Sequence, residues 1–354
     1  MSAQRKEAER ILRKLSGETA CLREDQWVAI EALVAGRRRV LCVQRTGWGK
    51  SAVYFVATVL LRQQQSGPTL IISPLLALMR NQIDAANRAG IVARSINSVN
   101  LAEWNDIYDE ILEGKVDALL ISPERLTHPD FRDYIIPKLA ATTGLLVVDE
   151  AHCISDWGHD FRPDYRRIRT LLDALPPSVP VLATTATANT RVVTDVAEQL
   201  GDTKVIRGPL DRRSLHLSVV KLPTSGLRLA WLADHLKDLP GSGIIYTLTV
   251  GVAQQVADFL SSRGYNVIAY SSQTEDLERR AAEADLIGNR VKAVVATSAL
   301  GMGFDKADLG FVVHLGAPPS PVAYYQQIGR AGRSIEQAHV LLLPSDQDLA
   351  IWRP

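Results

Sequence analysis

The sequence predicts an α/β protein built from two lobes, each a mainly parallel sheet flanked by helices. Short aliphatic runs without apolar–polar alternation, the pattern of strands buried on both faces, alternate with longer segments of helical period. These runs outnumber the strands that one doubly wound sheet usually holds. The chain has 354 residues, enough for two domains that each bury a core.

The expected elements follow in order along the chain. An amphipathic surface helix is expected over 1–15, a stretch that is charged throughout and lacks the apolar middle of a secretory signal. Strands are expected at 40–43, 69–73, 118–122, 145–150, 180–185, 205–208, 242–246, 266–270, 292–297, 311–315 and 339–343. Helical period is clearest at 52–61, 75–89, 189–200, 250–263 and 275–288. Residues 207–226 carry Pro, Gly and charge but little periodicity, so we place one lobe at 1–208 and the other at 209–354.

Composition narrows the setting. The hydrophobic share of 46% and the charged share of 22% are those of a globular protein, and no apolar run approaches the roughly 20 residues of a membrane span. Cys21, Cys42 and Cys153 are widely separated and form neither a disulfide framework nor a zinc-ligand pattern. We therefore expect no membrane association and a reducing compartment, the cytoplasm of a bacterium or the nucleus of a eukaryote.

The formal net charge of +1 gives no overall attraction to nucleic acid. Any contact with a phosphate backbone would come from local basic clusters. The candidates are Arg37 to Arg39, Arg162 with Arg166 and Arg167, and Arg330 with Arg333. For Arg37 to Arg39, a solvated surface is the favoured interpretation.

A strand, a glycine-bearing loop and a helix follow one another at Thr46-Gly-Trp-Gly-Lys-Ser51. This is the context in which a phosphate-loop motif is credible. Gly47 and Gly49 let backbone N–H groups turn inward around phosphates, and the helix that follows adds its positive end. Lys50 would meet the β- and γ-phosphates of ATP, and Ser51 would help to hold Mg²⁺. The alternative is a chance Gly-Lys-Ser sequence on a surface turn.

Two carboxylates, Asp149 and Glu150, end the aliphatic run of LLVVDEAH. Ligands of open α/β sheets bind at this end of the strands. Asp149 suits a hold on Mg²⁺, and Glu150 suits positioning or deprotonating the attacking water. An acidic helix cap is the alternative, which the phosphate loop upstream disfavours. His152 is interpreted as a coupling residue, because no second His stands at a metal-binding spacing.

The second lobe contains YYQQIGRAGR. Arg330 and Arg333 are three residues apart, so both could face one bound triphosphate if they share a helical turn. Guanidinium groups from a partner domain stabilise charge on a transferring phosphoryl group. Hydrolysis would then depend on closure of the lobes, which turns a chemical step into motion. A solvated basic turn is the alternative.

Taken together, these motifs resemble superfamily 2 helicases, and CISDWGHDFRPDY after DEAH resembles the aromatic-rich loop of RecQ DNA helicases. LREDQ (22–26), SPLLALMRNQ (73–82), SPERL (122–126), ATTATA (183–188), SGIIY (242–246) and the stretch 301–334 are similar to further RecQ motifs. The resemblance covers about residues 10–353. It implies two tandem RecA-like lobes with ATP bound in the cleft between them, DNA as partner, and a monomer.

The resemblance also implies roles for individual residues. Arg23 and Gln26 would recognise adenine. Thr46, Gly47, Gly49, Lys50 and Ser51 would bind the phosphates and Mg²⁺, with Asp149 holding the metal. Asp305, Gln326, Arg330 and Arg333 would serve the nucleotide from the second lobe. Trp157, His159, Phe161 and Arg162 would bind DNA and relay its presence to the ATPase site, since aromatic faces stack on unpaired bases. Packing in the core is the alternative for Trp157 and Phe161.

Several positions depart from the family pattern. Thr19 stands where the family has an aromatic residue that stacks on adenine, and Trp48 replaces a loop glycine. The general phosphate-loop pattern has glycine where this chain has Gln44. The sequences at 246–250 and 271–273 also differ from the family's. The zinc module and winged helix of typical RecQ proteins are not found, so we expect a divergent branch or, preferably, a piece of a longer protein.

Three functions stay open at this point. The leading one is a DNA-stimulated ATPase that moves 3′-to-5′ along single-stranded DNA and unwinds tailed or forked duplexes, with roles in DNA repair and recombination. A second is a nucleic-acid-binding or remodelling module that does not separate strands. The third, least favoured, is an RNA helicase of the same superfamily, because the WGHDFRPDY loop is foreign to the usual RNA-helicase pattern.

Overall fold

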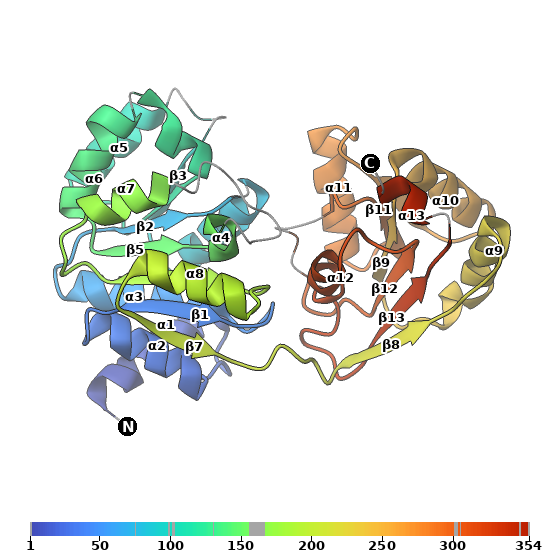
Figure 1. Cartoon of the computed structure of the whole chain (residues 1–354), viewed down its shortest axis with the longest axis horizontal. Helices are drawn as coiled ribbons and strands as arrows, with labels where there is room; N and C mark the ends of the chain where they lie inside the picture. The colour runs from blue at the N-terminus through green and yellow to red at the C-terminus, as the bar shows by residue number, and fades with distance from the viewer. Residues whose placement is uncertain are drawn as a thin grey trace. The chain divides into compact units, whose positions relative to one another are not determined.

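The computed structural model describes residues 2–74, 76–97, 100, 103–129, 131–155, 167–300, 304, 306–346 and 348–352. By contacts within the chain, it divides into two compact units, Met1–Leu210 and Asp211–Pro354. Each unit is an α/β sandwich around one sheet (Figure 1). In the described part of the chain, no helix is both long and apolar enough to cross a membrane.

The first unit holds a seven-stranded parallel sheet in the order β3-β4-β2-β5-β6-β1-β7. Its strands are β1 (Arg39–Val43), β2 (Thr69–Ile72), β3 (Ala93–Ile96), β4 (Ala118–Ile121), β5 (Leu145–Val148), β6 (Val181–Thr185) and β7 (Thr203–Arg207). Its α-helices are α1 (Ala3–Ser16), α2 (Glu24–Val34), α3 (Lys50–Gln63), α4 (Leu76–Arg88), α5 (Trp104–Leu112), α6 (Ile136–Thr142), α7 (Arg167–Ala174) and α8 (Thr190–Leu200). Short helical turns lie at η2 (Pro123–Thr127), η3 (Phe131–Ile135) and η4 (Ala151–Ile154).

Alternate residues of the first sheet point to two separate cores. Leu41 and Val43 of β1 pack into a core with α5 to α8, whereas Val40 and Cys42 pack into one with α1 to α4. Since successive side chains of a strand point to opposite faces, a strand covered on both sides must be apolar throughout. This is why the strands are continuous aliphatic runs in the sequence.

The second unit holds a six-stranded parallel sheet in the order β10-β11-β9-β12-β13-β8. Its strands are β8 (Leu215–Val219), β9 (Gly243–Thr247), β10 (Val267–Tyr270), β11 (Ala293–Ala296), β12 (Phe311–Leu315) and β13 (Ala338–Leu343). Its helices are α9 (Ser225–His235), η6 (Leu236–Asp238), α10 (Val250–Ser262), α11 (Asp276–Ile287), α12 (Pro321–Ile328) and α13 (Asp348–Trp352). The sheet again separates two cores.

The predicted α/β class with two parallel sheets is confirmed, and each predicted strand and helix is present within a few residues. Two strands were missed. β3 is a four-residue strand with only two apolar side chains, Ala93 and Ile96. β8 lies inside the segment 207–226 that was interpreted as a break; it is the edge strand of its sheet, with Leu217 and Val219 both more than half exposed. Neither has the long buried run by which the other strands were recognised.

Candidate nucleotide site

The phosphate loop connects the carboxyl end of β1 to the first residue of α3. Gly47 and Gly49 have φ of 77° and 96°, a left-handed conformation that glycine adopts without strain. A Cβ at Gly49 would also come within 2.7 Å of the Gln26 amide nitrogen. Thr46 and Gly47 lie in this loop, and the exposed Ser51 is the second residue of α3. The backbone therefore has the strand–loop–helix geometry in which N–H groups gather around phosphate.

Lys50 occupies the first position of α3. Its Nζ donates to the backbone carbonyls of Gln44 at 3.0 Å and Arg45 at 3.4 Å. The ammonium group therefore lies over the loop that would enclose a triphosphate. Burial raises the pKa of the Asp149 carboxyl, and the charge of Lys50 partly offsets that rise.

Asp149 follows β5, is only 6% exposed, and is held by groups from separate elements. Its Oδ1 accepts from Thr184 Oγ1 of β6 at 2.6 Å and from the Glu150 backbone N–H at 3.0 Å. Its Oδ2 accepts from Gln82 Nε2 of α4 at 3.3 Å. The carboxylate is thus fixed at the edge of the sheet where β1, β5 and β6 end, the same edge as the phosphate loop.

Burial is the largest cause that raises the pKa of Asp149, and repulsion by the Glu150 carboxylate raises it further. The hydrogen bond from Thr184 and the charge of Lys50 lower this pKa by less. The same two carboxylates add to the effect of burial in raising the pKa of Tyr54 well above its usual value. Tyr54 lies on α3 and is completely buried. A cation beside these two carboxylates would offset their mutual repulsion.

Glu150 adopts a left-handed conformation, φ 50° and ψ 46°, which is uncommon for a residue with a side chain. Such a backbone costs roughly 1–3 kcal/mol, and the surrounding structure must hold it. Oε2 of Glu150 lies 3.3 Å from Nδ1 of the fully buried His152, and that same nitrogen lies 3.1 Å from Thr185 Oγ1. His152 therefore connects Glu150 to the end of β6.

The donor set fits Mg²⁺. Mg²⁺ takes oxygen ligands and is usually held by one or two carboxylates together with substrate phosphates. A buried, oriented carboxylate at Asp149, the mutual repulsion of Asp149 and Glu150, and the Ser51 hydroxyl on the adjoining turn provide that chemistry. Among the residues that the structure describes, no cluster of three His, Cys, Asp or Glu side chains is arranged as a complete metal site. The metal would then depend on the nucleotide for the remaining ligands.

The LREDQ motif (22–26) leads into α2. Gln26 is 4% exposed; its Oε1 accepts from the Arg23 N–H at 2.9 Å, and its Nε2 donates to the Trp48 carbonyl at 2.9 Å. Both ends of the amide are therefore engaged within the protein. Arg23 and Thr19 are exposed.

In the second unit, Arg330 and Arg333 follow α12 and have different surroundings. Arg330 is 6% exposed, and its Nη1 donates to the Phe304 carbonyl at 3.1 Å. Burial raises the pKa of Tyr246 in β9, and the charge and hydrogen bond of Arg330 partly offset that rise. Arg333 is half-buried, with Nε donating to the Gly329 carbonyl at 3.4 Å. Arg330 therefore serves the packing of its own lobe, whereas Arg333 lies nearer the surface. Gln326 lies on α12, half-buried.

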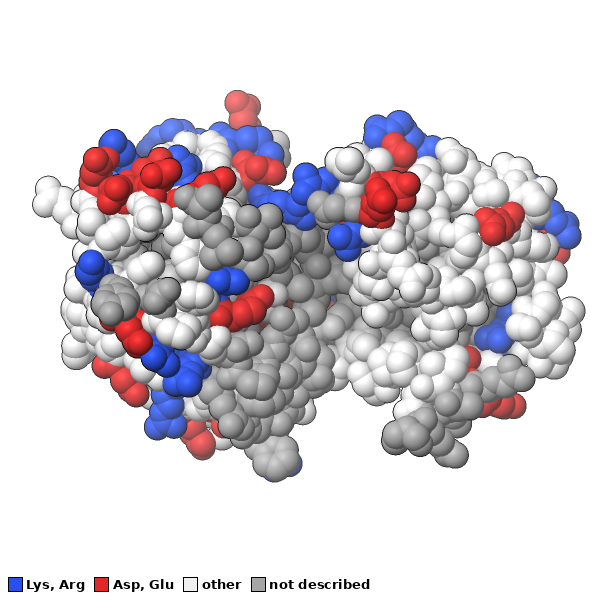
Figure 2. Space-filling view, turned by 90° about the horizontal axis from the view of Figure 1, so that it is seen from above, with Lys and Arg blue, Asp and Glu red and all other residues white. Residues whose placement is uncertain are grey.

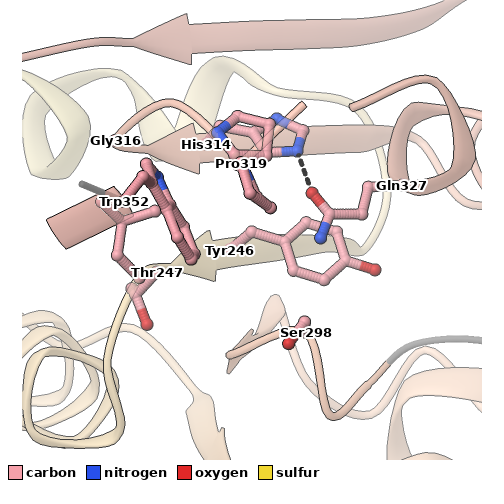
Figure 3. A pocket seen from close by; sticks show the side chains of 10 residues that line it. Tyr246, Thr247, Ser298, His314, Gly316, Pro319, Gln327 and Trp352 are labelled. Atoms are coloured by element: carbon pink, nitrogen blue, oxygen red, sulfur yellow. Dashed lines mark hydrogen bonds between the residues drawn. The ribbon is translucent and has the colours of Figure 1, made fainter. Parts of the chain in front are cut away.

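A small cavity lies at the carboxyl edge of the second sheet (Figure 3). His314 Nε2 and Gln327 Oε1 meet there at 2.8 Å, and the His314 ring stacks on Tyr246 with centroids 5.3 Å apart. Burial lowers the pKa of His314 to about 4. Trp352 of α13 forms part of the lining, and its Nε1 donates to the Ala317 carbonyl at 2.9 Å. Its volume of about 30 Å³ has room for a water molecule.

Some predicted residues cannot be placed. Asp305 and the loop residues Trp157, His159, Phe161 and Arg162 lie outside the described residues, as does Arg166. Arg37 to Arg39, interpreted as a solvated surface, are exposed or half-buried, and each also binds a neighbour within its lobe. Over the face shown in Figure 2, the described acidic and basic side chains are interspersed.

Family models match the chain in succession. The DEAD/DEAH box helicase model matches residues 23–196, and the helicase conserved C-terminal domain model matches 228–334. The chain belongs to the DEAD/DEAH-box helicases of superfamily 2. It carries the conserved helicase core of this family, and the predicted RecQ-like character is confirmed by its curated relatives.

Among these relatives is the ATP-dependent DNA helicase RecQ of Bacillus subtilis (strain 168), 34% identical over 94% of this chain and 55% of its own length. A protein of Acanthamoeba polyphaga mimivirus named as an ATP-dependent RNA helicase is also 34% identical, over 94% of this chain and 59% of that protein. The chain spans about half the length of the curated relatives it matches. The structure of the DUF1998 helicase MrfA bound to DNA superposes with a TM-score of 0.80 at 18% identity, covering 98% of this chain and 52% of that one. This likeness shows the shared fold of two RecA-like lobes.

Lys50, Asp149 and Glu150 were predicted from the sequence, but the residues that bind the Asp149 carboxylate were not. Thr184 and Gln82 bind the Asp149 carboxylate. Both lie in segments, ATTATA and SPLLALMRNQ, that resembled family motifs without indicating a contact. Thr184 reaches Asp149 because β6 ends beside it, and Gln82 reaches it because α4 packs nearby.

Proposed function

We propose that this chain is the motor of a RecQ-type DNA helicase, which hydrolyses ATP in response to single-stranded DNA and moves 3′-to-5′ to unwind tailed or forked duplexes. The observation that carries the ATPase part is the convergence of Lys50, Asp149 and Glu150 at one edge of the first sheet. The DNA part is supported by the similarity to RecQ DNA helicases over nearly the whole chain.

In the proposed reaction, water attacks the γ-phosphorus of ATP, and the bond to the ADP oxygen breaks. The N–H groups of the phosphate loop and Lys50 bind the phosphates and stabilise the charge that develops on them. Glu150 orients the attacking water and accepts its proton. The left-handed backbone at Glu150 and the contact with His152 help to position its carboxylate. Bound Mg²⁺, held through Asp149 and Ser51, would supply neutralising charge on the phosphate oxygens.

The second lobe is proposed to complete the ATPase. Under this proposal residues 1–208 form the ATP-binding lobe and 209–354 the C-terminal helicase lobe. Arg333, with Asp305 and Gln326, would serve the nucleotide, since an added guanidinium stabilises the transferring phosphoryl group. Arg330 was expected to do the same, and its burial supports an additional role in holding Phe304.

The loop around Trp157 is proposed to contact unpaired bases and to relay their presence to Glu150. Trp157, His159, Phe161 and Arg162 provide aromatic faces and charge for single-stranded DNA. Trp157→Ala should keep basal ATP hydrolysis and lose most of its stimulation by single-stranded DNA. Equal stimulation of the variant and the parent would show that the loop is structural.

The nucleotide site is tested by Lys50→Ala. ATP hydrolysis should fall at least a hundredfold with and without DNA, about 3 kcal/mol of transition-state stabilisation. Hydrolysis at the parent's rate would exclude this site. A strand-displacement assay on a 3′-tailed and a 5′-tailed duplex then separates a 3′-to-5′ helicase, which releases only the first, from a module that binds both and releases neither.

An RNA-dependent motor is the second candidate. It is favoured by one observation, the 34% identity to the mimivirus protein named as an RNA helicase. ATP hydrolysis measured with equal concentrations of single-stranded DNA and RNA of the same sequence decides between them. Stimulation by RNA alone would overturn the DNA assignment.

A further inference from the structure

Two residues of the phosphate loop depart from the glycine pattern, and their side chains bind the same acceptor atom. Gln44 stands where the general pattern has glycine, and Trp48 separates the two loop glycines. Only 1% of Gln44 and 4% of Trp48 is exposed. Buried N–H groups require acceptors. Both of these side chains donate to the same oxygen atom.

That atom is Oδ2 of Asp25, in the first turn of α2. It accepts from Trp48 Nε1 at 2.9 Å and from Gln44 Nε2 at 3.0 Å. The other carboxylate oxygen accepts from the Gln26 backbone N–H at 3.0 Å, which orients the carboxylate on the helix. Hydrogen bonds to an ionised carboxylate are stronger than those between neutral groups. One side chain thus joins the start of the loop and its middle to α2.

Two further contacts hold the same loop. The Gln26 amide donates to the carbonyls of Trp48 at 2.9 Å and Gly49 at 3.5 Å. On the other side, a Cβ at Gly208 would come within 2.2 Å of the Gln44 amide oxygen, so the turn after β7 packs directly on that side chain. Gln44 and Trp48, which depart from the glycine pattern, therefore fill the space beside the loop and hold it in place through hydrogen bonds.

We propose that Asp25 is a positioning residue for nucleotide binding, which acts through Trp48 and Gln44 to hold the phosphate loop in its binding shape. The inference rests on the proposed nucleotide site. A loop that is already ordered loses less conformational freedom when the ligand binds, so the affinity is higher. Because the three side chains fix the loop that receives the phosphates, their effect should be the same for any nucleoside triphosphate.

The test uses Trp48→Phe, which keeps an aromatic ring and removes the indole N–H, and Asp25→Asn, which removes the charge. Each should raise the KM for ATP about fivefold to tenfold, the effect of one buried hydrogen bond, with a smaller change in kcat. The Kd for ADP should rise by a similar factor, and the KM for GTP by the same factor as for ATP. The double variant should be little worse than the weaker-binding single variant, because both changes remove one shared interaction.

Trp104→Phe is the matched control. Trp104 is also a buried indole of the first unit, 9% exposed, and its Nε1 lies 3.4 Å from Asn100 Oδ1, outside the phosphate loop. This variant should leave both KM values unchanged. A rise equal to that of Trp48→Phe would mean that any buried indole change weakens binding, and would overturn the proposal.

Two other results bear on it differently. If Lys50→Ala abolishes nucleotide binding while Trp48→Phe and Asp25→Asn leave it unchanged, Asp25 has no positioning role and the nucleotide site itself stands. If Lys50→Ala also leaves binding unchanged, the proposed site is wrong and this inference with it. A rise in KM confined to ATP would overturn the phosphate-loop explanation, because the base would then be the group recognised.

Discussion

The hydrogen bond from Thr184 to Asp149 gives a prediction that links stability to the carboxylate proposed to hold Mg²⁺. Thr184→Val keeps the shape of the side chain and removes the donor that lies 2.6 Å from Oδ1. Thr184 is fully buried and Asp149 is 6% exposed, so water cannot readily replace the lost partner. A hydrogen bond to a charged group contributes about 1.5–3 kcal/mol to the free energy of unfolding.

The loss should depend on pH. Burial and Glu150 raise the pKa of Asp149 in the folded state, and Thr184 opposes that rise. A group whose pKa is higher in the folded state than in the unfolded state stabilises the protein most below the unfolded-state pKa. The free energy of unfolding then falls as pH increases through the folded-state pKa. Removing Thr184 raises the folded pKa further. The variant should therefore be nearly as stable as the parent at about pH 4 and about 2 kcal/mol less stable at pH 7–8.

The measurement is thermal unfolding of the first lobe, followed by circular dichroism between about pH 4 and 8 without nucleotide. For a unit of this size, Met1–Leu210, the expected loss lowers Tm by about 4–8 °C at neutral pH. Thr58→Val is the control: its hydroxyl is also buried, but its partners are the Tyr54 carbonyl and the Thr69 hydroxyl, which do not ionise in this range. A Thr184→Val penalty that is constant with pH, like the one expected for Thr58→Val, would refute the reasoning.

Three further predictions follow from single contacts. Gly49→Ala places a Cβ at φ 96° and within 2.7 Å of a side-chain amide, so ADP affinity, measured by titration, should fall at least about tenfold. Arg330→Ala should destabilise the second lobe by about 3 kcal/mol in denaturant unfolding, because the buried Phe304 carbonyl loses its donor; Arg333→Ala should leave stability unchanged and reduce ATP hydrolysis. His314→Gln should remove a rise in second-lobe stability between about pH 4 and 6.5. In this range the lowered pKa of His314 means that the unfolded state binds more protons than the folded state, so stability increases with pH.

The sequence alone predicted the two sheets because of how their strands are buried. A strand such as β5, covered by helices on both faces, must be aliphatic at every position, and such runs are visible without any structure. The exposed edge strand β8 has no such requirement, so the sequence around it was interpreted as a break. Burial on one or both faces therefore decides which strands can be recognised from sequence.

The proposed reactive groups could be named from the sequence because phosphate chemistry restricts residue types at fixed local spacing. Lys50 beside two glycines, and Asp149 next to Glu150 after a strand, are short patterns within a few residues of one another. Their supporting groups follow no such rule. Thr184 and Gln82 reach Asp149 from 35 and 67 residues away, and any hydrogen-bond donor in the right place would serve.

What the sequence by itself determined is thus the fold class, the nucleotide motifs and the family. What only the tertiary structure decided is how those motifs are held: Trp48 and Gln44, which counted as departures from a glycine pattern, both bind Asp25. The physical reason is range. Backbone conformation and charge at a phosphate loop are set by neighbouring residues, whereas a shared hydrogen-bond acceptor depends on how α2 packs beside β1 and α3.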